Sequence, residues 1–213
     1  MTLLMGLNLR AVLAIKRISI TNDKSIPNFI GAWQIEDTSL CDEIISFFES
    51  NPQKQVIGQT DAGLSDGKKS IDLVIQPKEI KAEPYSMFYE YIRQLYLCYS
   101  DYLEEWGFLK NYGRIEIGSF NVQRYLPGDH FKMLHTERDS LSNMHRIFAW
   151  MTYLNDVPES GETCFSFYDL NVKPEKGKTL IWPAEWTHAH SANILTKGEK
   201  YIVTGWMSFP SIV

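Results

Sequence analysis

The C-terminal half of the chain is a series of short segments rich in β-branched and aromatic residues, and this pattern constrains the fold most. Turns that contain Gly or Pro separate the segments, as is usual between the strands of antiparallel proteins. The segments are RIEIGSFNVQRYL (114–126), RIFAWMTYLNDV (146–157), TCFSFYDLNVKP (163–174), KTLIWPAEWTHAHSA (178–192) and KYIVTGWMSF (200–209). Such a series predicts a mostly β region, folded as a sandwich or barrel.

The N-terminal half supplies the helices of the predicted fold. Apolar residues recur at helical spacing in 39–50, after polar residues that favour a helix start. A longer amphipathic helix is predicted for 84–105, with Pro84 at its beginning. Shorter strands are expected within 28–37 and 71–77. We therefore expect a mainly β fold with α, in which helices buttress one side of a β core.

Size and composition favour one domain over residues 1–213. The chain is 44% hydrophobic and contains no repeat, low-complexity run or evident linker. Its net charge is −5 without a basic stripe, so no nucleic-acid partner is expected. Charged residues interrupt the apolar first 20 residues, which predict neither a membrane span nor a clear signal peptide. We expect an ordered first strand or helix there, after a leading tail.

The three cysteines bear on the compartment. Cys41, Cys98 and Cys164 are far apart and odd in number, and they form neither a zinc spacing nor a disulfide framework. This usage is typical of a reducing compartment, so a cytoplasmic location is expected.

Two histidine-containing stretches suggest a metal site. In MLHTERD, His135 and Glu137 are two residues apart, so their side chains share a face if the segment ends a strand. The later stretch THAHSANILTKGEK contains His188 and His190, and either can supply a third ligand because both share a face of a regular strand. Two imidazoles and one carboxylate, with coordination positions left open, are typical of non-haem Fe(II) oxygenases. The alternative is that each histidine is an ordinary strand residue.

The same region resembles a known family. The stretch QRYLPGDHFKMLHTERD, the strand RIFAWMTYLNDV, the segment SGETCF and the final HSANILTKGEKYIVTGW together resemble the catalytic core of the 2-oxoglutarate/Fe(II)-dependent dioxygenases. The similarity is to the prolyl 4-hydroxylase-like branch, which includes small bacterial and phage members. It covers about residues 114–209, and it implies a double-stranded β-helix, the jelly-roll or cupin-like core, with residues 20–113 providing helical support and a lid loop.

The resemblance implies roles for individual residues. The implied iron ligands are His135, Glu137 and His190. Lys200 follows the distal histidine by ten residues, which implies that it pairs with the distal carboxylate of 2-oxoglutarate. Tyr125 and Tyr153 are candidate phenol donors to the same co-substrate, and Tyr153 is expected to point into the barrel. The spacing to Lys200 favours His190 as the ligand and assigns His188 to a supporting place.

The chain departs from the family pattern at three positions. Glu137 stands where the family usually has Asp, Phe131 where many members have Tyr, and Ser160 where a Gly is usual. None of these changes removes a ligand. The remaining histidines, His130 and His145, are expected at the surface or in loops.

The implied reaction hydroxylates a C–H bond while 2-oxoglutarate and O2 become succinate and CO2. The implied cofactors are Fe(II) and 2-oxoglutarate, with ascorbate as an accompanying reductant. The expected substrate is a prolyl residue of a peptide or protein, and Trp150, Trp182 and Trp186 are candidate apolar walls for its ring, or else core. One alternative is the same chemistry on a free amino acid or small metabolite. Another is a non-catalytic, metal-binding β-sandwich module.

A polar, glycine-containing stretch at 51–70 is predicted to be a long loop. Loops of this length are often functional lids, and the family has a flexible loop at a comparable place. Gly58, Gly63 and Gly67 are candidate hinges, and the segment 68–70 lies near an Arg-x-Ser motif of the family. An ordinary surface loop is the alternative interpretation.

Overall fold

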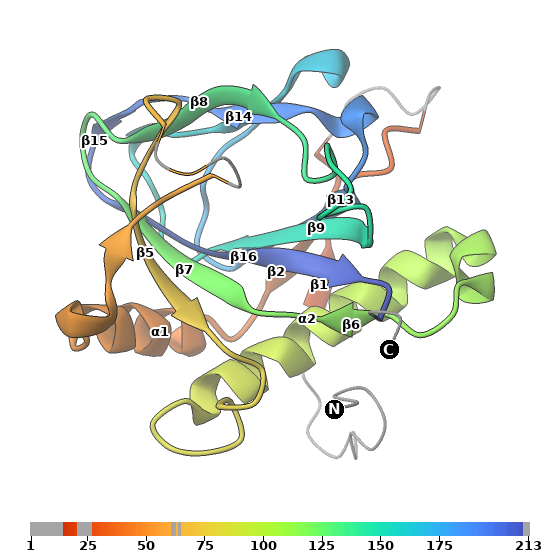
Figure 1. Cartoon of the computed structure of the whole chain (residues 1–213), viewed down its shortest axis with the longest axis horizontal. Helices are drawn as coiled ribbons and strands as arrows, with labels where there is room; N and C mark the ends of the chain where they lie inside the picture. Colours follow the sequence, from red (N-terminus) through yellow and green to blue (C-terminus); the bar gives the residue numbers. More distant parts are fainter. Residues whose placement is uncertain (1–14, 21–26, 61–62, 64, 211–213) are drawn as a thin grey trace.

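The computed structural model describes residues 15–20, 27–60, 63 and 65–210. Two β-sheets face each other, and two helices cover the outer side of the larger sheet (Figure 1). The predicted class, a mainly β core with helices on one side, is confirmed. Of the predicted first strand or helix, residues 15–17 form a strand, and residues 1–14 lie outside the described part of the chain.

The larger sheet has nine strands, and its neighbours all pair antiparallel in the order β1-β2-β13-β9-β16-β7-β5-β3, with β6 beside β16. Its strands are β1 (Ile15–Arg17), β2 (Gly31–Ile35), β3 (Val56–Ile57), β5 (Ile71–Ile75), β6 (Glu116–Ile117), β7 (Phe120–Tyr125), β9 (Arg146–Tyr153), β13 (Lys178–Pro183) and β16 (Lys200–Ser208). The two longest strands, β9 and β16, lie next to each other at its centre.

The smaller sheet has five strands in the order β12-β11-β14-β8-β4. Its strands are β4 (Lys68–Lys69), β8 (His130–His135), β11 (Thr163–Phe165), β12 (Leu170–Val172) and β14 (His190–Ala192). A separate antiparallel pair joins β10 (Glu159–Ser160) to β15 (Leu195–Lys197). Side chains from both sheets meet in one buried cluster, in which Phe165 and Val172 of the smaller sheet contact residues of the larger one.

The two helices are α1 (Ser39–Glu49) and α2 (Ser86–Glu105), so the predictions of 39–50 and 84–105 are correct to within two residues. Single 3-10 turns are η1 (Pro52–Lys54), η2 (Gly107–Asn111), η3 (Ser166–Tyr168) and η4 (Trp186–His188). Among the described residues, no helix is long and apolar enough to cross a bilayer.

Alternating residues of the larger sheet contribute to two hydrophobic cores, one on each face of the sheet. On β9, Phe148 and Trp150 face the helices, whereas Ala149, Met151 and Tyr153 face the smaller sheet. This division follows from the two-residue period of a strand. Strand β9 is therefore buried on both faces, which explains its nearly continuous apolar run.

The predicted strand 178–192 is in fact divided between the two sheets. Its first part is β13 in the larger sheet, the chain then turns through η4, and its last part is β14 in the smaller sheet. Pro183 ends the first part, because proline has no N–H to continue a ladder. His188 and His190 therefore do not share a strand face, contrary to the regular strand assumed from the sequence.

Candidate active site

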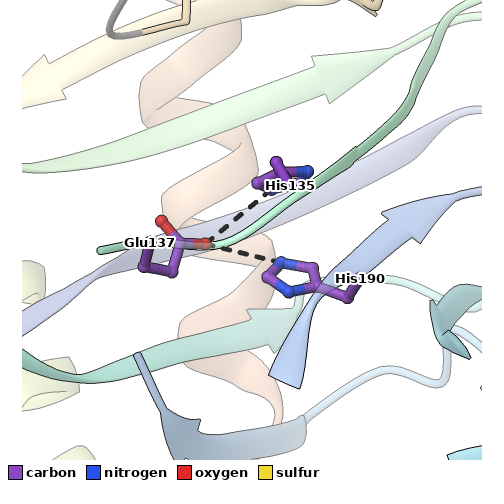
Figure 2. A group of neighbouring side chains, drawn as sticks. All are labelled: His135, Glu137 and His190. Carbon is purple, nitrogen blue, oxygen red and sulfur yellow. Dashed lines mark ion pairs between the residues drawn. The ribbon is translucent and has the colours of Figure 1, made fainter. Parts of the chain in front are cut away.

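Three side chains predicted to bind a metal converge between the two sheets. His135 ends β8, Glu137 follows it by two residues, and His190 begins β14, where it is the cross-strand partner of His135. One ligand atom from each residue lies within 4.8 Å of the others (Figure 2). Their side chains are 16%, 14% and 8% exposed, so the cluster is sheltered but reachable from one side.

Both imidazoles are held in the orientation that a metal needs. The Nδ1 of His135 lies 2.9 Å from the Met133 carbonyl, and the Nδ1 of His190 lies 3.0 Å from the His188 carbonyl. A carbonyl can only accept, so Nδ1 carries the proton in each ring and Nε2 keeps its lone pair. The Nε2 atoms lie 3.8 and 3.4 Å from the Glu137 Oε1, respectively. All three potential ligand atoms thus face one point.

The carboxylate of Glu137 is held from its other side. The indole N–H of Trp206 donates to its Oε2 at 2.6 Å, and the Arg146 guanidinium lies 3.8 Å above the Trp206 ring. Burial would raise the pKa of Glu137, but the neighbouring His190 and His135 and the hydrogen bond from Trp206 lower it to about 2. Burial and the nearby His190 lower the pKa of His135 to about 4. At neutral pH, His135 is therefore a neutral imidazole and Glu137 a carboxylate.

Aromatic side chains enclose the two histidines. The Phe131 ring stacks on His135, with ring centroids 3.7 Å apart and planes 10° apart. Trp182 meets His190 edge-on at 5.1 Å, and Phe165 lies 5.5 Å from the same ring. These apolar walls restrict rotation of the imidazoles and limit the approach of water.

Lys200, which was predicted to bind the co-substrate, is buried in the wall of a cavity next to the three clustered residues. That cavity has a volume of about 200 Å³, and both Lys200 and the three clustered residues line it. The lysine is 2% exposed, its Nζ donates to the Gly161 carbonyl at 2.9 Å, and it lies 4.6 Å above the Tyr125 ring. Among the described residues, no carboxylate lies within ion-pair distance of it. Burial lowers the pKa of Lys200 to about 8.

The two tyrosines predicted as phenol donors occupy different places. Tyr125 lines the cavity, but its hydroxyl donates to the Gln123 Oε1 at 2.7 Å. Tyr153 points into the space between the sheets, as predicted, and its hydroxyl donates to the Thr163 Oγ1 at 2.7 Å. Tyr153 is not part of the cavity wall described by the structure. Both hydroxyl protons are thus used within the protein.

The other histidines lie apart from the cluster. His188 is buried in η4, where its Nε2 lies 2.8 Å from the Asn28 carbonyl. His130 is half-buried at the start of β8, and His145 is exposed between strands. Of the three candidate tryptophans, Trp182 lines the cavity, Trp150 is buried against α2, and Trp186 is 67% exposed.

Sequence reasoning missed the support that β16 gives to the site. Every second residue of this strand from Lys200 to Trp206 lines the cavity, namely Lys200, Ile202, Thr204 and Trp206. Strand periodicity starting from Lys200 was the available signal. It would have placed Trp206 on the same face as Lys200 and near the carboxylate.

The predicted loop at 51–70 is more structured than expected. It contains η1, the short strand β3 paired with β5, and β4 paired with β8, while residues 61, 62 and 64 lie outside the described part. Gln59, Thr60 and Lys68 line the cavity. The stretch thus contributes directly to the site.

Comparison with known proteins shows what the region around the cluster is similar to. The model of the 2OG-Fe(II) oxygenase superfamily matches residues 120–208, the region that contains the three clustered residues and Lys200. Residues 120–208 are thus similar to a 2OG-Fe(II) oxygenase domain. A probable prolyl 4-hydroxylase 9 of Arabidopsis thaliana is 32% identical over 115 residues, 42% of this chain and 40% of that protein. Prolyl 4-hydroxylase 13 of the same plant is 28% identical over 115 residues, with 42% of each covered. The chain therefore matches about two-fifths of the length of these relatives.

Solved structures share the fold of nearly the whole chain. A Pseudomonas putida prolyl-4-hydroxylase has a TM-score of 0.63 at 14% identity, with 93% of this chain and 94% of that chain covered. A viral collagen prolyl hydroxylase of Paramecium bursaria Chlorella virus-1, in a 2OG complex, has a TM-score of 0.58 at 16% identity, covering 91% and 94%. A Trichoplax adhaerens prolyl hydroxylase has a TM-score of 0.64 at 15% identity, covering 85% and 84%. The predicted double-stranded β-helix is confirmed.

The residues of this chain fit the two groups that the family name specifies. Two imidazoles and a carboxylate suit Fe(II), and their potential ligand atoms already face one point. A buried ammonium without a carboxylate partner suits an anionic co-substrate, because a buried charge is stable only when it is paired.

Proposed function

We propose that this chain is an Fe(II)- and 2-oxoglutarate-dependent dioxygenase that hydroxylates a prolyl residue of a peptide or protein. The observation that supports this most strongly is the shared cavity. The cluster of two imidazoles and one carboxylate lines it together with the buried, carboxylate-free Lys200. One compartment can thus hold a metal and an anion side by side.

Each residue has a role in this proposal. His135, Glu137 and His190 would hold the iron, and Lys200 would pair with the distal carboxylate of 2-oxoglutarate. When bound, iron and 2-oxoglutarate supply the oxidation of a C–H bond by O2, with succinate and CO2 as the other products. The backbone carbonyls of Met133 and His188 accept from the Nδ1 atoms, which turns both Nε2 atoms toward the metal position. The surrounding aromatic rings exclude water from the reacting groups.

The prolyl substrate is supported by relatives of this chain. The curated relatives are named as prolyl 4-hydroxylases, and the Trichoplax structure holds a peptide fragment of a hypoxia inducible factor oxygen degradation domain. In this chain, Trp182 and Met151 give the cavity apolar surface that suits a pyrrolidine ring. Arg146 and Asp139 line the same cavity and suit the polar backbone of an extended peptide.

The test combines turnover with product analysis. Protein with Fe(II), 2-oxoglutarate, ascorbate and O2 is incubated with proline-containing peptides, free proline or a set of small metabolites. We expect succinate formation stimulated by a peptide, and a gain of one oxygen on a prolyl residue by mass spectrometry. The His135→Ala variant is the control and should give neither. Oxidation of free amino acid alone would replace the substrate assignment, and metal binding without any succinate would indicate a binding module.

We also propose that the protein works in a reducing, cytoplasmic compartment. The proposal rests on the cysteines, since Cys41 and Cys98 are buried as free thiols and Cys164 is a third free thiol. Fractionation of the source cells with an antibody against the chain tests it. Recovery in an oxidising compartment would contradict it.

A further inference from the structure

Two buried lysines line the cavity, and among the described residues only one of them has a carboxylate partner. Lys200 has no carboxylate partner among the described residues, whereas Lys68 donates to the Asp72 Oδ2 at 2.8 Å. Lys68 also donates to the Gln59 carbonyl at 3.1 Å. The side chains of Lys68 and Asp72 are 5% and 8% exposed. This second lysine has no part in the function proposed above.

The Lys68–Asp72 ion pair bridges the two sheets. Lys68 belongs to β4, at the edge of the smaller sheet, and Asp72 belongs to β5 of the larger sheet. The chain passes from one sheet to the other within the three residues that lie between them. Since both charges are shielded from water, each depends on the other for compensation. The ion pair therefore fixes β4 against the larger sheet at the edge of the cavity.

From Asp72, hydrogen bonds run across the larger sheet toward Lys200. Gln123 is the cross-strand partner of Asp72 and donates its Nε2 to the Asp72 Oδ2 at 3.0 Å. This bond turns the Gln123 Oε1 toward Tyr125, whose hydroxyl donates to it at 2.7 Å. Tyr125 is in turn the cross-strand partner of Lys200, whose ammonium lies above its ring. Each donor thus sets the orientation of the next side chain.

Lys68 also reaches toward the metal end of the cavity. It is the cross-strand partner of Phe131, and its ammonium lies 5.5 Å from the centroid of that ring. Phe131 stacks on His135. The same lysine therefore contacts both the wall behind a metal ligand and the row of side chains that ends beneath Lys200.

We propose that Lys68, Asp72 and Gln123 are positioning residues that couple the edge strand β4 to the anion site at Lys200. The proposal rests on the function proposed above, in which Lys200 receives 2-oxoglutarate. With the ion pair intact, Gln123 holds Tyr125 beneath the Lys200 ammonium, and Lys200 keeps its place. With the ion pair broken, Lys68 no longer fixes the Asp72 carboxylate, so this carboxylate no longer holds Gln123. Gln123 can then rotate, and the support of Lys200 is lost. By linkage, an anion bound at Lys200 also stabilises β4 in its place.

The first test measures binding of 2-oxoglutarate without turnover. The protein is loaded with Mn(II) under nitrogen and titrated calorimetrically with 2-oxoglutarate. Asp72→Asn keeps the size of the side chain but removes its charge, and Gln123→Met breaks the row while leaving the ion pair intact. We expect each to weaken 2-oxoglutarate binding by at least about fivefold, the lower end of common coupling energies, with Mn(II) affinity unchanged. Lys69→Met is the matched control, because it removes an exposed lysine of the same strand that pairs with Asp129.

The second test follows the coupling in the opposite direction, by hydrogen exchange. 2-Oxoglutarate should slow amide exchange at residues 68–72 in the wild-type protein and in Lys69→Met, but not in Gln123→Met. A merely structural role for the ion pair would not predict this dependence on the ligand.

The outcomes separate this proposal from the proposed function. If the wild-type protein binds no 2-oxoglutarate, the proposed function fails, and this proposal fails with it. If the wild-type protein binds it and Gln123→Met binds it equally well, the proposed function stands and the coupling is disproved. Equal slowing of exchange in the wild type and Gln123→Met would also disprove it.

Discussion

Trp206 places a hydrogen-bond donor behind Glu137, and this contact has a measurable consequence for metal affinity. The indole N–H fixes the Oε2, so that the Oε1 is turned toward the two imidazoles. We expect Trp206→Phe to lower the affinity for Fe(II) or Mn(II) by roughly 10-fold, a typical effect of removing such support. Competition with a chromophoric chelator measures it. Trp186→Phe, which changes an exposed ring, should leave the affinity as it is, and equal losses in both variants would contradict the assignment.

Lys200 provides the second prediction at the residue scale. Replacing it with Met would leave the distal carboxylate of 2-oxoglutarate buried without a cation, which costs about 3–5 kcal/mol. We therefore expect 2-oxoglutarate binding to weaken by roughly two to four powers of ten, while metal affinity stays nearly constant. Calorimetry on the Mn(II) form measures both. Unchanged 2-oxoglutarate binding would mean that the co-substrate does not bind at Lys200.

The lowered pKa of Lys200 predicts a pH dependence of the same binding step. Burial lowers this pKa to about 8, and only the protonated form attracts a carboxylate. A bound anion raises the pKa again, so the affinity is constant below pH 8 and falls as pH rises above it, by up to about tenfold per unit. Lys200→Arg stays charged throughout this range. A titration at pH 7, 8 and 9 should show the fall in wild type and its absence in the Arg variant.

Single residues also show where sequence reasoning reached its limit. The spacing of His190 and Lys200 was sufficient to prefer His190 over His188, and the structure places His190 in the cluster and His188 in a separate turn. The hydrogen bond from Tyr125 to Gln123 could not be predicted. It depends on which way a carboxamide is turned, and Asp72, far away in the sequence, decides that.

At the scale of elements, the helices support the strands that carry the site. Phe88 of α2 is fully buried and packs edge-on against Phe47 of α1 and Phe120 of β7. Strand β7 also carries Gln123 and Tyr125. The helices therefore act on the site through the back of the sheet, and not through direct contact with the cavity.

Truncating Phe88 tests this support. We expect Phe88→Ala to lower the free energy of unfolding by about 3–5 kcal/mol, as is usual for a buried phenylalanine that leaves a cavity. Urea denaturation followed by circular dichroism measures it. Phe108→Ala is the control, because this ring is 73% exposed, and its effect should stay within about 0.5 kcal/mol. A small loss for Phe88→Ala would mean that α2 does not anchor β7.

Helices were predicted more accurately than strands, for a physical reason. The apolar repeat of α2 lies within one segment, whereas a strand boundary depends on its partners. Thus 114–126 became β6 and β7, and 178–192 was divided between two sheets. Pro183 predicts an interruption of the strand but not a change of sheet, so only the pairing of β13 with β9 and of β14 with β8 reveals the crossing.

For the whole molecule, the position of the cavity between both sheets predicts a global effect of ligands. A ligand that binds only the folded state at 100 times its Kd stabilises that state by about 2.7 kcal/mol. For a chain of this size, we expect 2-oxoglutarate with Mn(II) to raise Tm by roughly 5–10 °C. Differential scanning fluorimetry measures the shift. 2-Oxoglutarate should have little effect in His135→Ala, and an equal shift there would place its binding outside the site.

The pairing of β14 with β8 provides a way to check whether a refolded molecule has the correct strand register. His190 lies opposite His135 in this register, with an irregularity just beyond it. A slip of one residue would turn His190 away from the cavity and put Ser191 or Ala189 in its place, although most of the hydrophobic core could still form. Such a misfolded chain would retain His135 and Glu137 but lack the third donor. Retention of metal during gel filtration would therefore separate correctly registered molecules from slipped ones after refolding.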